Sequence, residues 1–167
     1  MYDILVLKKA KRRFVMVEEI LRKMNIEIPA KVVRGGVYKP VMQSGNQLYV
    51  SGQGCTRDGK PVYQGTVGKD VTLEEAQDAA RICAINALAA LKEHLGTLDG
   101  IRLVKTLAFV ASDSSFSDQH LAANGCSEFL KSLYGDDLGV GARSAIGVAK
   151  LPGNIPVEIE FVFELLD

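Results

Sequence analysis

The sequence lacks tryptophan, has only two histidines and three cysteines, and has no net charge. Because 20 Lys and Arg residues balance 20 Asp and Glu residues, the overall field does not favour nucleic acid or an anionic membrane as a partner. Cys55, Cys83 and Cys126 are far apart and form no Cys-x-x-Cys motif, which favours reduced thiols over a disulfide framework or a zinc site. We therefore expect a cytoplasmic protein without a metal, in which the cysteines are structural.

Long apolar runs are also missing, since none reaches the roughly 18 residues that a membrane span requires, and we expect no membrane partner. Near the N-terminus a short apolar patch precedes the basic cluster Lys8–Arg13, which is the reverse of the order in a secretory signal. We interpret residues 1–15 as an arm without an assigned function. The length of 167 residues suits one domain, and we expect an arm with a short helix over 1–33 and a single domain over 34–167.

Apolar periodicity predicts three helices, of which the first is short and amphipathic. The longest begins at a capping box formed by Thr72 and Glu75 and ends at Gly96. Its apolar face consists of small residues, including Cys83, and suits close packing on a sheet. We expect the last helix to end at Gly135. The predicted ranges are 15–24, 73–95 and about 117–134.

Strand signals surround these helices. A hairpin turns at Ser44-Gly45-Asn46, another strand follows near residue 101, and two more strands, 143–149 and 157–165, flank the turn at Pro152-Gly153-Asn154 and are expected to pair as a hairpin. This order predicts an α+β fold, with a sheet of five to six mainly antiparallel strands and two long helices on one face. The other face is left uncovered, and self-association would bury it.

Charged residues in the last two strands are the first candidates for a site. Arg143 opens an otherwise small and apolar strand, where a guanidinium buried alone would cost stability, so it is either solvated or placed to bind an anion. Glu158 and Glu160 alternate with apolar residues. In an average strand these acids would be solvated, but on an uncovered face they would line a subunit interface.

Several segments together resemble the Rid family of reactive intermediate deaminases, also called YjgF-like proteins. The resemblance covers roughly residues 34–165 and rests on "SGNQLYVSGQ", on the helix after "GTVGKDVTLEEAQ" and above all on "ARSAIGVAKLPGNIPVEIE". It implies a subunit with the chorismate-mutase-like fold, a homotrimer, and sites at the subunit boundaries. It also implies hydrolysis of small 2-imino (enamine or imine) acids to 2-keto acids and ammonia without a cofactor.

The resemblance assigns roles by position. It implies that Arg143, with Ser144 beside it, binds the substrate carboxylate, and that Glu158 positions the attacking water. Tyr38 would support the water or ligand through its hydroxyl, and the backbone at Gly52 would approach the ligand.

The helix asparagine of the family falls on either His120 or Asn124, and the sequence leaves both open. For His120, a surface position in the helix is the simpler interpretation. The chain departs from the usual family pattern and, with its added N-terminal helix, resembles a longer, divergent branch. The departures are at Lys39, Pro40, Ala145 and Gly147.

Two other functions compete with imine hydrolysis. A non-catalytic trimer could bind a small carboxylate at Arg143 and act as a regulator. A ribonuclease, an activity attached to the family's name, is less favoured because the chain has balanced charge and no aromatic cluster for stacking RNA bases. We favour the deaminase over the regulator, and the regulator over the nuclease.

Overall fold

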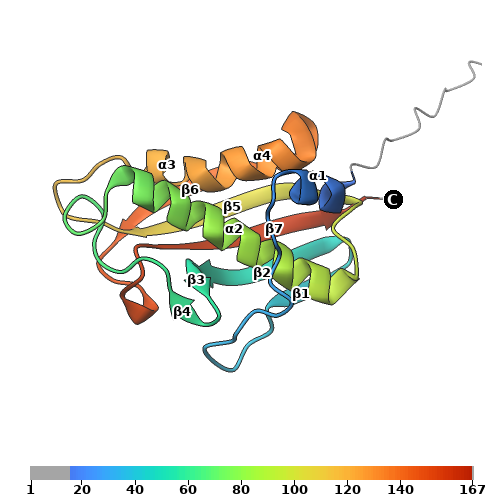
Figure 1. The fold of residues 1–167 in the computed structure, drawn as a ribbon, viewed down its shortest axis with the longest axis horizontal. Helices are drawn as coiled ribbons and strands as arrows, with labels where there is room; N and C mark the ends of the chain where they lie inside the picture. Colours follow the sequence, from blue (N-terminus) through green and yellow to red (C-terminus); the bar gives the residue numbers. More distant parts are fainter. Residues whose placement is uncertain (1–15, 167) are drawn as a thin grey trace, which may run out of the picture.

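The computed structural model describes residues 16–166, and their centre is a five-stranded sheet (Figure 1). The strand order is β1-β2-β7-β5-β6, and a separate two-stranded ribbon joins β3 to β4. Helices cover one face of the sheet (Figure 1), which confirms the predicted α+β architecture. The expectation for residues 1–15 lies outside the described residues. The strands are β1 (Val41–Ser44), β2 (Gln47–Gly54), β3 (Thr56–Arg57), β4 (Lys60–Pro61), β5 (Ile101–Ala111), β6 (Ala142–Val148) and β7 (Val157–Leu165).

The long helix α2 has the predicted ends. The Thr72 hydroxyl accepts a hydrogen bond from the Glu75 backbone N–H, and the Glu75 carboxylate accepts one from the Thr72 N–H. Gly96 caps the other end in the left-handed conformation, with φ of 78°. The next predicted helix is divided into α3 and α4, and Gly135 interrupts α4 rather than ending it, again with positive φ. The helices are α1 (Val17–Lys23), α2 (Leu73–Leu95), α3 (Gln119–Ala122) and α4 (Asn124–Gly139).

The predicted hairpin between the last two strands is wrong. Strand β5 lies between them, and it pairs with β6 in parallel and with β7 in antiparallel orientation. The reason is the order β5, α3, α4, β6, because a helical crossover returns a strand parallel to the one that it left. Five of the seven residues of β6 are glycine, alanine, serine or arginine, and none of the seven is buried, which suits an edge strand, whereas the apolar β5 takes an inner place.

One face of the sheet forms the core. Along β7, Val157, Ile159, Phe161 and Phe163 are buried against the helices, and the residues between them are not, which confirms the predicted alternation. The small residues of α2, including the fully buried Cys83, pack closely on this face. Within residues 16–166, no helix is long and apolar enough to cross a membrane.

The short helix α1 packs on the same layer as the other helices. Val17 and Leu21 are buried in the main apolar cluster. The Val17 N–H donates a hydrogen bond to the Asp99 carboxylate at 2.9 Å, and Glu18 forms an ion pair with Lys92 of α2 at 3.2 Å. These contacts join α1 to the end of α2 and to the loop before β5.

The helices α2 and α4 meet at Gly125, where a Cβ would overlap the backbone carbonyl of Gln77. We predict that Gly125→Ala forces the two helices apart and lowers the free energy of unfolding by about 1–3 kcal/mol, as overpacking does in other cores. Urea unfolding followed by circular dichroism would measure the loss. Gly35→Ala is the matched control, because a Cβ there meets nothing within 4 Å. Equal stability of both variants would contradict the close packing.

Candidate functional site

Arg143 lies on the edge strand β6 and points toward the helices. It pairs with Thr106 of β5, whose side chain is buried under the helices, and directly opposed residues of neighbouring strands share a face. From this position the guanidinium reaches the residues around the junction of α3 and α4. Arg143 is nonetheless exposed, because within the described chain no strand pairs with the outer edge of β6.

Three neutral acceptors hold the guanidinium of Arg143. Nη1 donates to Asn124 Oδ1 at 2.9 Å and to Ser127 Oγ at 3.0 Å, and Nη2 donates to the His120 carbonyl oxygen at 3.2 Å. A guanidinium has five N–H donors, so one on Nε and one on Nη2 have no acceptor in the described chain. These two nitrogens share one edge of the guanidinium, which is the edge that a carboxylate can bind with both oxygens.

Glu158 lies on the opposite face, on the inner strand β7. It is partly buried, and this burial, together with the charge of Glu160, raises the pKa of its carboxyl group above the usual 4.5. Its carboxylate lies directly against Gly52 of β2, where a Cβ would overlap Glu158 Oε1. Glycine at this position therefore creates the space that the carboxylate occupies.

Glu158 also lines a groove of about 510 Å³ between β2, the β3–β4 ribbon and the segment before β1. Tyr38 borders the same groove and is 41% exposed. The Tyr38 hydroxyl accepts a hydrogen bond from the Gly35 N–H at 3.3 Å, so its own proton is free to be donated to a ligand. The groove thus brings together three of the predicted site residues, Glu158, Tyr38 and Gly52.

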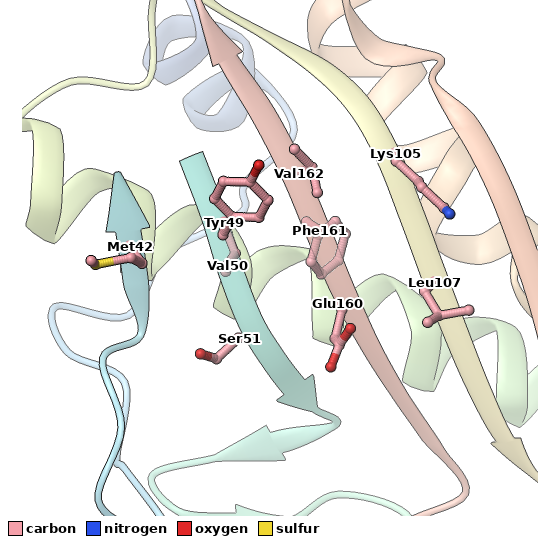
Figure 2. Close-up of a pocket in the computed structure, with 9 residues that line it drawn as sticks. All are labelled: Met42, Tyr49, Val50, Ser51, Lys105, Leu107, Glu160, Phe161 and Val162. Atoms are coloured by element: carbon pink, nitrogen blue, oxygen red, sulfur yellow. The ribbon is translucent and has the colours of Figure 1, made fainter. Parts of the chain in front are cut away.

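A second hollow, of about 370 Å³, lies beside this groove on the uncovered face of the sheet. Figure 2 shows Tyr49 on β2, Glu160 and Val162 on β7, and Lys105 on β5, with the helices behind the strands. Most of the residues that line this hollow are apolar, and its charged side chains are Lys105 and Glu160. Ile146 of β6 is also exposed on this face of the sheet, so exposed apolar side chains are present as far as the β6 edge.

Arg143 and Glu158 do not meet within one chain. Arg143 is aligned with Thr106 of β5, and Glu158 is aligned with Phe109, three residues further along on the other side of that strand. Two strand spacings and three residues separate their Cα atoms by about 14 Å. Because their side chains also point to opposite faces of the sheet, one small ligand cannot contact both in the same subunit.

The remaining predicted residues, Ser144, Asn124 and His120, lie near Arg143 but differ in whether they contact it. Ser144 follows it in the strand and faces the other side of the sheet. Asn124 reaches Arg143 with its side chain, whereas His120 does so only with its backbone carbonyl. Ser127 was missed, although its spacing from Asn124 places both on one side of α4 and could have indicated it.

All three cysteines are buried, which confirms the core position predicted for Cys83. Burial raises the pKa of Cys126 to about 12, against the opposing effect of the nearby Arg143 charge, and it also raises the pKa of Cys55 and Cys83. Neutral thiols of this kind are poor nucleophiles and poor metal ligands. Over residues 16–166, no group of three or more His, Cys, Asp or Glu side chains is arranged to hold a metal ion.

Comparisons with known proteins agree with this architecture. The sequence model of the family described as "YjgF/chorismate_mutase-like, putative endoribonuclease" matches residues 18–158. The chain is 38% identical to Protein TCP17 of Trypanosoma cruzi over 146 residues, which cover 87% of this chain and 91% of the relative.

Solved structures show the same relationship. The crystal structure of protein Atu1372 from Agrobacterium tumefaciens is similar with a TM-score of 0.83 and 40% identity, over 90% of this chain and 92% of that one. The YjgF gene product of E. coli is more distant, with a TM-score of 0.56 and 25% identity, over 82% of this chain and 91% of that one. The chain is more similar to Atu1372 than to the YjgF gene product, which agrees with the prediction of a divergent branch of the family.

The raised pKa of Glu158 predicts how stability depends on pH. Between the unfolded and folded pKa values the folded state binds more protons than the unfolded state, so ionisation of Glu158 destabilises the fold as the pH rises. We predict that Glu158→Gln increases the free energy of unfolding at pH 7, and that the gain disappears as the pH falls below 4.5. Urea unfolding at several pH values measures this, with the exposed Glu27→Gln as control. A loss of stability at pH 7 would contradict it.

Proposed function

This chain belongs to the YjgF/chorismate-mutase-like family, and on that premise we propose that it hydrolyses small 2-imino acids to 2-keto acids and ammonia without a cofactor. The observation that carries the proposal is the guanidinium of Arg143, which is fixed by three neutral acceptors and keeps two donors on one edge. A 2-imino acid supplies the matching anion in its carboxylate. We propose that the site forms between two subunits of a homotrimer.

Carboxylate recognition at Arg143 would gain from this fixed geometry. The hydrogen bonds to Asn124 and Ser127 orient the guanidinium before a ligand arrives, so less side-chain freedom is lost on binding. Since none of the three acceptors is charged, the positive charge is not neutralised within the described chain. A carboxylate would therefore accept the remaining hydrogen bonds and neutralise the charge.

Glu158 is suited to move the protons. Hydrolysis begins when a water oxygen bonds to the imine carbon, while the Glu158 carboxylate accepts one water proton and passes it to the imine nitrogen. The carboxylate then accepts the proton of the new hydroxyl group and passes it to the amine nitrogen, the carbon–nitrogen bond breaks, and ammonia leaves as the carbonyl forms. A carboxyl group whose pKa is raised above its usual range is a better proton acceptor than an ordinary carboxylate and can return the proton in the next step. Tyr38, with its free hydroxyl proton, would hold the water or the nitrogen beside it.

The second subunit is required by the geometry of the first. Glu158 and Arg143 lie on opposite faces of one sheet, so a ligand that needs both must receive them from different chains. The uncovered face presents large apolar side chains, including Met42, Tyr49 and Ile146, which are 54%, 48% and 44% exposed. Clusters of this kind commonly mark a protein interface. We propose that the neighbour that covers this face places its edge strand β6 beside the groove.

The description of the family also names an endoribonuclease. We favour imine hydrolysis, because equal numbers of basic and acidic residues and the lack of tryptophan do not favour an RNA-binding surface. Cleavage of RNA by the metal-free protein would support the nuclease. If the protein bound 2-keto acids without releasing ammonia from imines any faster than water does, it would be a carboxylate-binding regulator.

We predict that Arg143 and Glu158 contribute to different steps. Arg143→Ala should abolish 2-keto acid binding, and Arg143→Lys should restore little, since an ammonium lacks the planar fork. Glu158→Gln should keep binding and reduce the rate of imine hydrolysis about 10²- to 10⁴-fold. Binding is measured by calorimetry, and ammonia release is measured with imines that an amino-acid oxidase generates in the assay. Arg57→Ala removes an exposed cation from the β3–β4 ribbon and serves as control. Full activity of Glu158→Gln would refute its role.

We also predict that inactive variants complement each other. In a mixed trimer of Arg143→Ala and Glu158→Gln chains, one boundary pairs an intact Arg143 with an intact Glu158. Random reassembly of cyclic trimers should therefore recover about a quarter of the parental activity. Each variant reassembled with itself is the control, and mass spectrometry confirms that mixed trimers form. Absence of activity in verified mixed trimers would show that the two residues act within one chain or not at all.

A further inference from the structure

The groove that contains Glu158 also contains an arginine. Arg34, from the segment before β1, lines it together with Tyr38 and Gly52. The groove volume of about 510 Å³ lies in the range that usually holds drug-sized ligands. A short imino acid would fill only the part next to Glu158, so the remainder, with its arginine, is available to a longer molecule.

The backbone on both sides of Arg34 is held in place. Val33 packs over the turn of the β3–β4 ribbon, where a Cβ at Gly59 would lie 3.3 Å from its Cγ1. On the other side, the Gly35 N–H donates to the Tyr38 hydroxyl. Val32 packs against the main apolar cluster. These contacts hold the backbone from which the Arg34 side chain extends, at a position that lines the groove.

The charge of Arg34 is not neutralised by a neighbour. Over residues 16–166, no Asp or Glu carboxylate lies within 4.0 Å of its guanidinium nitrogens. The Glu158 carboxyl shares the groove but does not pair with it, and burial and Glu160 raise the pKa of Glu158 rather than a cation lowering it. The groove therefore combines an unpaired cation with space for the group that would pair with it.

We propose that Arg34 binds a second carboxylate, so that the preferred substrates are dicarboxylic 2-imino acids, such as the imines of aspartate or glutamate. This inference rests on the proposed function, because the first carboxylate would be bound by Arg143 of the neighbouring subunit. The carbon between the two carboxylates would then lie at Glu158. A guanidinium suits the second position for the same reason as the first, since it donates two parallel charge-assisted hydrogen bonds.

Binding of matched keto acids to the intact protein tests the assignment without requiring turnover. We expect the parent to bind 2-ketoglutarate more tightly than 2-ketobutyrate in calorimetry. Arg34→Ala should weaken 2-ketoglutarate binding about tenfold, as loss of a charge-assisted contact does, and leave 2-ketobutyrate binding within about twofold. Arg34→Lys, which keeps the charge, should give an intermediate loss. Lys39→Ala removes an equal charge from the same segment but not from the groove, and should change neither affinity.

The outcomes separate this inference from the proposed function. If the parent binds neither acid, or if Arg143→Ala binds both as well as the parent, the proposed function fails and this inference fails with it. If 2-ketobutyrate binding depends on Arg143 but the preference for the dicarboxylate survives Arg34→Ala, only the role of Arg34 is overturned. An equal loss for both acids in Arg34→Ala, or an equal effect of Lys39→Ala, would likewise overturn it.

Discussion

Burial of only one face of the sheet is the constraint on which the rest of the structure depends. The helices take the apolar side of β7 and leave the other side, with Glu158, without cover in the chain. Burial of an ionisable group raises its free energy unless a partner compensates. The sheet therefore gives Glu158 a half-buried position beside a groove, and it gives Arg143 a place at the edge on the opposite face. Any site that uses both residues is a property of an assembly.

Local patterns predicted the elements well and the pairing of strands less well. The capping box at Thr72 and the alternation along β7 depend on residues close in sequence, and both were predicted correctly. The hairpin between β6 and β7 was predicted from the turn between them, and β5 separates them instead. A turn shows that the chain changes direction but not which strand it will join. The helices between β5 and β6 indicated the correct pairing, because a helical crossover joins parallel strands.

The same limit applies to the candidate site. The family resemblance assigned roles to Arg143, Glu158, Tyr38 and Gly52, and these roles stay predictions, but it did not show that the last three share a groove that lacks the first. Nor did it choose between two helix residues for the contact to Arg143, which depends on side-chain direction and favours Asn124. Contacts that join distant segments need the fold, whereas residue types in a specific order can be recognised without it.

The place of β7 has a consequence for how the chain is made. It is the last strand of the described sequence, yet it lies between β2 and β5 in the sheet (Figure 1). Until residues 157–165 leave the ribosome, β1 and β2 cannot join β5 and β6, and each half exposes an unpaired strand edge. Until β7 is available, these edges can pair with other chains, so the two half-sheets are the parts of the nascent protein most open to misassembly.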